Sequence, residues 1–212
     1  MAGATLFAVT IFVIRHGETD LNARRVLQRP ETALSARGRE QAALLADHLA
    51  GAGITHILSS DLARAQETAR ALEATTGACF ELEPLLQERN FGDLRGTPYA
   101  DLDEDPFQPG YHPPGGESQD AFATRVERAW AAITRVAGGL DGALAVVTHG
   151  LVCEAIARHH VERETGVEAP DSPLRFRNTS YSVIEGAGSW RLVRLGCDDH
   201  LEAMDEHDGG VA

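Results

Sequence analysis

Two histidine–glycine pairs stand where strongly apolar stretches of this sequence end. Arg15-His16-Gly17 follows residues 7–14, and Thr148-His149-Gly150 follows residues 143–147. Such apolar, β-branched runs predict buried strands, and open α/β sheets bind ligands at the carboxyl ends of their strands. A fixed guanidinium, a nucleophilic imidazole and a glycine that permits close backbone approach suit an anionic substrate. Taken singly, His16 is equally explained as a solvated turn residue, and His149 as a capping or core residue.

Two further charged residues are expected near strand ends. Arg64 stands in the first turn of a helix that follows the strand expected at 54–58, beside the positive end of the helix dipole. Glu88 stands on a loop beyond the strand expected at 78–83, where a carboxylate can act as a general acid or simply pair with a nearby arginine. A lone helical arginine is usually solvated. Four such residues, in order and at strand ends, together indicate one anion-binding site.

The elements expected around these residues alternate between strands and helices. This alternation predicts an α/β fold, a three-layer αβα sandwich with a mostly parallel central sheet and helices on both faces. Ser59, Ser60 and Asp61 are all candidate caps for the helix that contains Arg64, and Gly77 is its expected end. The strands are expected at 7–14, 54–58, 78–83, 143–148, 181–184 and 190–195, the last two as a hairpin, and the other helices at 35–50, 117–138 and 151–160.

We expect a single domain over residues 1–196, because 212 residues suffice for one large core. Residues 97–116 are rich in Pro, Asp, Gly and aromatics, which predicts a long loop or lid with short helical turns. Residues 162–173 are expected to be irregular. Residues 197–212 are interpreted as an acidic tail that can be disordered; a metal site at its histidines is conceivable, but a solvated tail is favoured.

The charge balance limits the partners of this chain. Nineteen basic and 32 acidic residues give a formal net charge of −13, which argues against nucleic acid and anionic membranes. The three cysteines, Cys79, Cys153 and Cys197, show neither a disulfide framework nor zinc spacing, so we expect a reducing, cytoplasmic compartment. No membrane-spanning run is visible, and the N-terminus lacks the basic region of a signal peptide.

Five motifs in order give the chain a resemblance to the histidine phosphatase superfamily, in its phosphoglycerate-mutase-like branch. The similarity covers residues 11 to about 185, so it implies a phosphoglycerate-mutase-like version of the αβα sandwich. One such motif would be a weak signal, whereas five in order are a strong one. The motifs are Arg15-His16-Gly17-Glu18-Thr19 with Asn22, the segment Ser60–Thr68, the segment Glu88–Gly96, Gly115-Gly116-Glu117-Ser118 and Thr148-His149-Gly150.

The resemblance implies a role for each motif residue. His16 would attack phosphorus and form a phosphohistidine, and Glu88 would protonate the leaving oxygen and then activate water. Neither a metal nor a cofactor is implied, because arginines and imidazoles supply the positive field. The oxygens of a small phosphorylated metabolite would be bound by Arg15, Arg64, His149 and Asn22, with Arg89 as a further substrate-binding residue.

Three activities are weighed, and a phosphatase is favoured. In the mutases of this family a tyrosine follows the acid motif, and an arginine pair from a longer insertion holds the substrate carboxylate. Here Phe91 takes the tyrosine's place, no adjacent arginine pair lies between residues 96 and 148, and the segment from Glu88 to His149 is short. A phosphoglycerate mutase is the alternative, followed by a non-catalytic protein that binds phosphorylated ligands. The identity of the phosphomonoester is open, as is the oligomeric state, with a homodimer as one option.

Overall fold

The computed structural model describes residues 8–168, 174–202 and 204. Its strands form a seven-stranded sheet in the order β3-β2-β4-β1-β6-β7-β5. Strand β6 runs opposite to its neighbours β1 and β7, whereas the other pairs in the sheet are parallel. The sheet is therefore mostly parallel, as the sequence predicts. The strands are β1 (Val9–Arg15), β2 (Ile54–Ser59), β3 (Cys79–Leu82), β4 (Ala143–Thr148), β5 (Glu162–Arg163), β6 (Tyr181–Gly186) and β7 (Trp190–Cys197).

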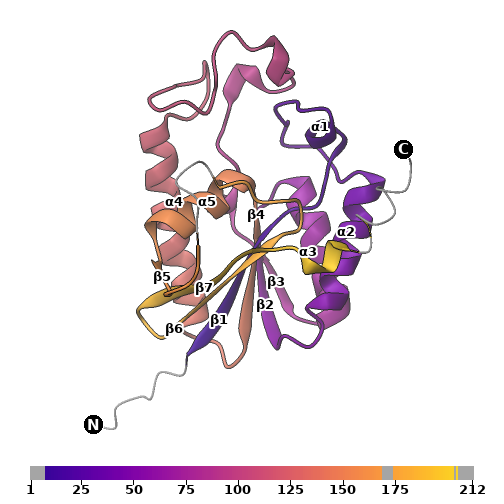
Figure 1. The fold of residues 1–212 in the computed structure, drawn as a ribbon, viewed down its shortest axis with the longest axis vertical. Coiled ribbons are helices and arrows are strands. Elements are labelled where there is room, and N and C mark those ends of the chain that lie inside the picture. Colours follow the sequence, from indigo (N-terminus) through magenta and orange to yellow (C-terminus); the bar gives the residue numbers. More distant parts are fainter. Residues whose placement is uncertain (1–7, 169–173, 203, 205–212) are drawn as a thin grey trace.

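Helices cover both faces of this sheet (Figure 1). Helices α4 (Gln119–Ala137) and α5 (Gly150–His159) lie on one face, and α2 (Ala36–His48) and α3 (Ala63–Thr76) lie on the other. The predicted three-layer αβα sandwich is confirmed. The remaining helical segments are the short α1 (Asp20–Ala23) and the 3-10 turns η1 (Pro84–Leu86), η2 (Gly92–Leu94), η3 (Tyr99–Asp101) and η4 (Asp199–Leu201).

The strand pleat explains why one sheet carries two cores. Successive side chains of a strand point to opposite faces. In β1, Ile11 and Val13 therefore join the core beneath α4 and α5, whereas Phe12 and Ile14 join the core beneath α2 and α3. Because both faces are covered, the central strands are apolar throughout, which is the pattern expected of a buried parallel sheet.

The register of the two central strands places the histidine–glycine pairs next to each other. Strand β1 pairs in parallel with β4, and Arg15 lies opposite Thr148 at the last position of the ladder. His16 and His149 are the next residues of the two chains, and the backbone N–H of His16 donates to the carbonyl of Thr148 at 2.9 Å. The carboxyl ends of β1 and β4 thus deliver both imidazoles to one place.

The predicted cap of α3 is wrong. Leu62 precedes this helix as its N-cap and makes no side-chain capping bond. The expected caps are used elsewhere: the Ser59 hydroxyl donates to the carbonyl of Ser60, and the Ser60 hydroxyl contacts His149. The Asp61 carboxylate accepts from Gln87. The caps of the other two long helices behave as expected, with Ser35 and Ser118 accepting backbone N–H groups of α2 and α4, and Gly77 ends α3 in the left-handed region.

The lid and the C-terminal segment complete the described chain. Residues 97–116 form the predicted long loop with one 3-10 turn, at the end of the sheet where β1 and β4 finish (Figure 1). Of the segment 162–173, which is expected to be irregular, residues 162–168 are described, and within them β5 pairs with β7. Residues 169–173 lie outside the described residues. Cys197, the first residue of the expected tail, ends β7, and Leu201 is buried. His207 lies outside the described residues. Among the helices of the described chain, none is long and apolar enough to cross a membrane.

Candidate active site

His16 and His149 are buried side by side at the carboxyl end of the sheet. Their exposed fractions are 2% and 0%, and their ring centroids lie 5.1 Å apart. Burial disfavours the charged form of each imidazole, and the nearby Arg64 and Arg15 guanidiniums disfavour it further. The pKa of both histidines is therefore lowered well below the ordinary value. Both rings are neutral at physiological pH.

The hydrogen bonds of His16 define which nitrogen is free to react. Nδ1 lies 2.7 Å from the carbonyl oxygen of Gly17. A carbonyl only accepts, so Nδ1 carries the proton and Nε2 carries the lone pair. The Nε–H of Arg64 donates to Nε2 at 3.3 Å. The unprotonated nitrogen thus faces the arginine that would hold an incoming anion.

The turn after His16 is held by two glycines that no larger residue could replace. A Cβ on Gly17 would lie 2.5 Å from the carbonyl oxygen of Gly38, and a Cβ on Gly38 would overlap the carbonyl oxygen of Glu18. The first turn of α2 therefore packs directly on the backbone beside His16. On the other side, the N–H of Gly17 donates to the hydroxyl of Thr68, which donates to the carbonyl of Arg64. This chain of contacts fixes His16 relative to α3.

Two guanidiniums, that of the buried Arg64 and that of the half-buried Arg15, lie near His16. Arg64 is 2% exposed, and desolvation by burial lowers its pKa to about 10. One Arg64 nitrogen donates to the carbonyl of Arg29, and one Arg15 nitrogen donates to the carbonyl of Phe176. Within the described chain, Arg15 Nε and His149 Nδ1 are buried without a hydrogen-bond partner. Buried polar groups are normally satisfied, so these atoms favour a polar, anionic ligand at this place.

Glu88 lies on the loop between η1 and η2, above the first turn of α5. One carboxyl oxygen accepts from the backbone N–H of Arg89 at 3.0 Å, and the other accepts from the N–H of Leu151 at 3.3 Å. Burial raises the pKa of Glu88, while these N–H groups and the two arginines only partly oppose the effect. A carboxyl group with a raised pKa next to two cations is suited to donate a proton.

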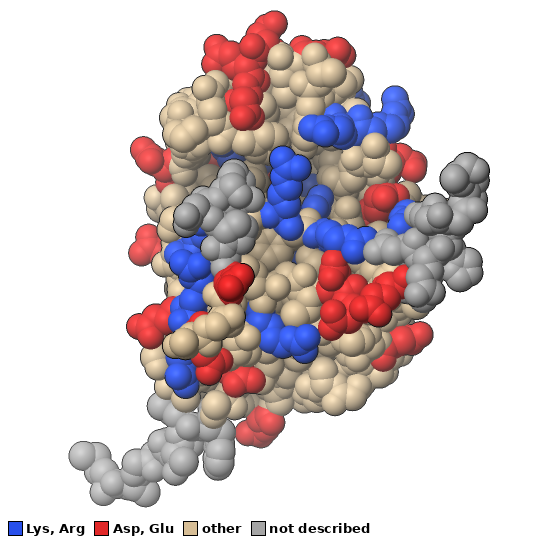
Figure 2. Space-filling model, viewed as in Figure 1, with Lys and Arg blue, Asp and Glu red and all other residues tan. Residues whose placement is uncertain are grey.

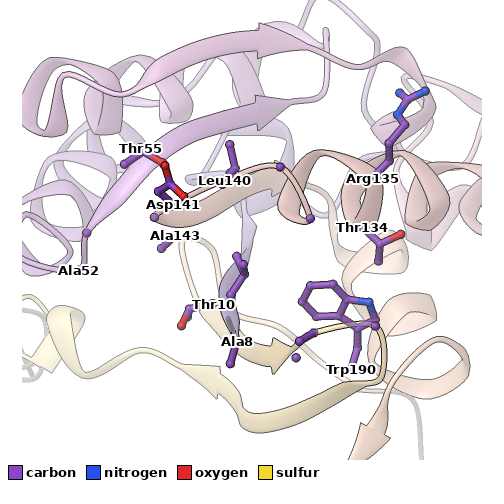
Figure 3. Close-up of a pocket in the computed structure, with 18 of the residues that line it drawn as sticks. Ala8, Thr10, Ala52, Thr55, Thr134, Arg135, Leu140, Asp141, Ala143 and Trp190 are labelled. Atoms are coloured by element: carbon purple, nitrogen blue, oxygen red, sulfur yellow. The ribbon is translucent and has the colours of Figure 1, made fainter. Parts of the chain in front are cut away.

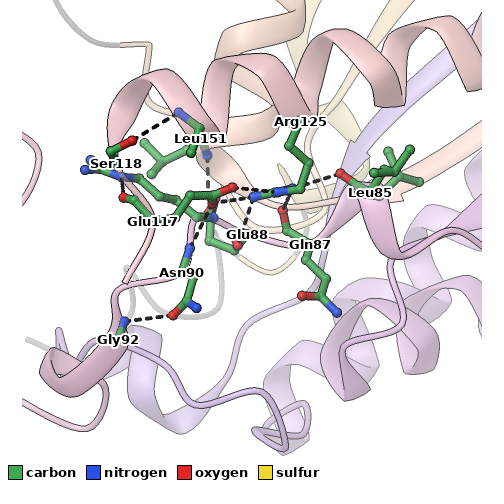
Figure 4. A network of polar contacts seen from close by, with 12 residues as sticks. Leu85, Gln87, Glu88, Asn90, Gly92, Glu117, Ser118, Arg125 and Leu151 are labelled. Atoms are coloured by element: carbon green, nitrogen blue, oxygen red, sulfur yellow. Dashed lines mark hydrogen bonds and ion pairs between the residues drawn. The ribbon is translucent and has the colours of Figure 1, made fainter. Parts of the chain in front are cut away.

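A half-buried ion pair supports the Glu88 loop (Figure 4). Arg125 of α4 contacts both carboxylate oxygens of Glu117, at 2.9 and 2.8 Å. The same guanidinium donates to the carbonyls of Leu85, Gln87 and Glu88, and Glu117 accepts the N–H of Asn90. The backbone on both sides of Glu88 is thus tied to one helix. Sequence reasoning missed Arg125, because nothing in the α4 pattern separates it from a solvated arginine.

A second support comes from the segment just before β6. Asn178 donates to the carbonyl of His16 at 3.0 Å and to the side-chain oxygen of Asn22 at 3.2 Å. The N–H of Thr179, a residue in the left-handed region with φ 59°, donates to the carbonyl of Arg15 at 3.1 Å. Among the described residues, the side-chain amide hydrogens of Asn22 have no acceptor, so they are available to a ligand. Asn178 and Thr179 lie outside every motif quoted above, so the sequence offered no signal for them.

One pocket collects most of the predicted residues. Arg15, His16, Asn22, Arg64 and Glu88 line it, and His149, which is not in the lining, lies beside His16 with its ring centroid 5.1 Å away. Arg89 lines it as well, but its three nitrogens donate to the carbonyls of Pro106, Tyr111 and Glu117, which places this side chain in the bonding of the lid. The pocket is completed by Phe91, which the sequence analysis places where mutases have a tyrosine, and by Tyr99 and Phe107 of the predicted lid. The remaining walls, to which the sequence analysis gave no role, are Leu27, Gln28, Pro30, Leu62, Arg95 and Leu151.

Comparison with known proteins agrees with this geometry. The family model of the histidine phosphatase superfamily (branch 1) matches residues 11–198. The chain belongs to this superfamily. A probable phosphoglycerate mutase, GpmB of Enterobacter sp. strain 638, is 31% identical over an alignment of 212 positions that covers 91% of this chain and 95% of the relative.

Solved structures of the superfamily have the same fold. YhfR of Bacillus stearothermophilus matches with a TM-score of 0.78 and 25% identity, over 92% of this chain and all of that one. A mycobacterial glucosyl-3-phosphoglycerate phosphatase matches with a TM-score of 0.75 and 27% identity, over 90% of this chain and all of that one. A putative alpha-ribazole-5'-P phosphatase of Escherichia coli K-12 matches with a TM-score of 0.74 and 29% identity, over 90% and 97%. The named relatives thus include phosphatases and a mutase-like protein.

A second, larger groove lies at the opposite end of the sheet (Figure 3). It is open between the amino ends of β1 and β4 and the last turn of α4, and its lining is mainly alanine, glycine and threonine. The charged residues of that lining are Arg135 and Asp141, and it has no histidine, cysteine or glutamate. The groups able to transfer a phosphoryl group are in the smaller pocket. Over the described residues, no three His, Cys, Asp or Glu side chains are grouped as a metal site.

Proposed function

We propose that this member of the histidine phosphatase superfamily is a phosphatase that hydrolyses a small phosphomonoester through a phosphohistidine on His16. The observation that carries the proposal is the state of His16. Its Nδ1–H is held by the Gly17 carbonyl, and its Nε2 lone pair faces Arg64. A neutral imidazole fixed in this tautomer is a ready nucleophile. A pocket volume of about 80 Å³ supports a small ester.

The first half of the reaction forms the phosphoenzyme. Nε2 of His16 attacks phosphorus, a P–N bond forms and the P–O bond of the ester breaks. Glu88 gives its proton to the leaving oxygen, so the product leaves as a neutral alcohol. Arg15, Arg64 and His149 hold the non-bridging oxygens, where charge is held during the transfer. Asn22 adds a neutral donor from its free amide hydrogens.

The second half returns the enzyme to its starting state. The Glu88 carboxylate accepts a proton from water, the water oxygen attacks phosphorus and the P–N bond breaks. Inorganic phosphate leaves, and His16 Nε2 regains its lone pair. Two arginines supply the positive charge that a metal ion supplies in other phosphatases, so we propose that the reaction needs no metal. The absence of disulfide spacing in the cysteines supports a cytoplasmic enzyme that acts on a metabolite.

A phosphoglycerate mutase is the second candidate, and the name of the GpmB relative favours it. Phe91 favours the phosphatase. Its side chain is buried in the pocket wall, where it packs edge-on against Phe107 with the two ring centroids 5.5 Å apart. A phenylalanine here offers no hydroxyl to a bound substrate.

Rapid quenching with a ³²P-labelled aryl phosphate tests the proposal. We expect one labelled histidine that loses its label in acid and retains it in base, and no label in His16→Ala. A label that resists acid would contradict the mechanism.

A further inference from the structure

The pocket contains arginines that the proposed mechanism does not use. Four arginines line it, namely Arg15, Arg64, Arg89 and Arg95. The first three donate hydrogen bonds to backbone carbonyls or to His16. Arg95 follows η2, is half-buried, and its guanidinium makes no hydrogen bond or ion pair within residues 8–168, 174–202 and 204. Figure 2 shows arginine surfaces gathered around the hollow beneath the upper lobe, whose outer side is acidic.

Backbone hydrogen bonds hold the segment next to Arg95 in place. The N–H of Gly96 donates to the carbonyl of Leu27 at 2.7 Å, and the N–H of Leu27 donates to the carbonyl of Thr97 at 3.0 Å. The Arg29 side chain lies against Gly96, and the carbonyl of Arg29 accepts from Arg64. Arg95 therefore lies on a two-segment wall that is itself bonded to the phosphate-binding arginine.

The charge balance of the pocket leaves Arg95 without a counter-charge. A phosphomonoester carries a charge of about −1.5 to −2 at pH 7, which Arg15 and Arg64 balance. His16 and His149 are neutral, and Glu88, the single acidic residue in the lining, is the proton donor. Arg95 is close enough to Arg64 to lower the pKa of that residue. A half-buried, unpaired cation is costly, and the cost is relieved when an anion pairs with it.

We infer that Arg95 binds a second anionic group, a carboxylate or a second phosphate, carried by the alcohol part of the substrate. The inference rests on the proposed function and adds the substrate class: a phosphomonoester with another acidic group near the ester. The aromatic and aliphatic residues that line the same pocket as Arg95 support this, because their low polarity strengthens a charge-assisted bond. They include Leu27, Phe91, Tyr99 and Phe107.

The test measures binding without turnover, in the His16→Ala background. One ligand pair is glycerol 3-phosphate and 3-phosphoglycerate, which differ by a primary alcohol against a carboxylate. The other is fructose 6-phosphate and fructose 1,6-bisphosphate, which differ by a second phosphate. We expect the added anion to lower the dissociation constant about 10- to 100-fold in at least one pair, because charge-assisted hydrogen bonds strengthen binding by about this much. The pair that shows the difference identifies the anion.

Arg95→Gln should remove this difference within a pair, and Arg95→Lys should restore part of it. The matched control is Arg24→Gln, which removes the same charge from an exposed residue of the neighbouring segment outside the pocket lining and should retain the difference. Equal weakening of both members of a pair would make Arg95 a third ligand of the transferred phosphate and overturn the inference. So would the absence of any difference before the substitution.

The same experiment separates this inference from the proposed function. If the unsubstituted enzyme released no phosphate from any ester while the Arg95-dependent difference persisted, the phosphatase proposal would fail and the second anion site would stand. If the enzyme hydrolysed esters with no Arg95-dependent difference, the opposite would hold.

Discussion

Replacing Glu88 by glutamine separates an acid catalyst from a structural carboxylate. Both carboxyl oxygens of Glu88 accept backbone N–H groups, and burial raises its pKa. Glutamine has nearly the same shape, but its amide cannot protonate a leaving oxygen. The leaving group of an alkyl phosphate is a strongly basic alkoxide, which needs that proton. The leaving group of a nitrophenyl phosphate is a weakly basic nitrophenolate, which does not. The two leaving groups should therefore respond very differently to Glu88→Gln.

The expected size follows from general acid catalysis, which contributes about 10²- to 10⁴-fold, or about 3–5 kcal/mol of barrier. We expect kcat/KM for an alkyl phosphate to fall by this factor, and that for p-nitrophenyl phosphate to fall less than about tenfold. Glutamine also loses one of the two N–H contacts, because its amide nitrogen cannot accept. That loss costs about 1–3 kcal/mol of stability. A thermal melt measures it, and Glu81→Gln on the exposed strand β3 is the matched control.

The acid role of Glu88 also predicts the direction in which the rate changes with pH. The protonated form of Glu88 is needed, and its raised pKa keeps that form present at higher pH than for an ordinary glutamate. The alkyl phosphatase rate should fall as pH rises through this pKa, and the fall should be absent in Glu88→Gln. Equal losses on both esters, with an unchanged pH profile, would refute the acid role and leave Glu88 as a positioning residue for Arg15 and Arg64.

Four further outcomes are expected. His16→Ala should leave the protein folded and reduce turnover to below a few per cent, measured as phosphate release; higher residual activity would exclude the covalent route. Turnover should survive EDTA, and its loss followed by rescue with a divalent ion would contradict the metal-free mechanism. With 3-phosphoglycerate and a trace of 2,3-bisphosphoglycerate we expect free phosphate, and rapid formation of 2-phosphoglycerate would instead identify a mutase. Gly38→Ala should destabilise the fold by about 1–3 kcal/mol or more in a denaturant titration, because its Cβ would overlap a backbone carbonyl, whereas Gly51→Ala meets nothing within 4 Å and should be near neutral.

The parts of this molecule that sequence predicts best are those that depend on local pattern. The apolar run before His16 and the run before His149 each report a buried strand, and strand ends are where an α/β sheet binds ligands. The prediction of the α3 cap was wrong for a non-local reason. The Ser60 hydroxyl contacts His149, which is 89 residues away in the sequence. The local sequence shows that a serine can cap a helix, but it does not show which other hydrogen-bond partner the fold places next to that serine.

The support of the site was not predictable for the same reason. Arg125 is one polar residue on an amphipathic helix, and its contacts with Glu117 and with the carbonyls beside Glu88 exist only after the loop has folded against α4. Arg95 lies within a motif that the sequence analysis quoted. That it has no hydrogen-bond or ion-pair partner among the described residues is visible only when the neighbouring segment 24–30 is in place. The residue type of Arg95 indicates that it can bind an anion, but whether a nearby acidic residue neutralises it depends on the folded pocket.

The segment that leads into β6 is as necessary to the site as the motifs themselves. It supplies the Phe176 carbonyl to Arg15, the Asn178 amide to the His16 carbonyl and the Thr179 N–H to the Arg15 carbonyl. A buried guanidinium would be strongly destabilised without such acceptors, so this segment keeps Arg15 in place before any substrate binds. The antiparallel strand β6, paired along β1, holds the segment there. Arg15, next to the proposed nucleophile His16, is therefore positioned by segments from both ends of the described chain.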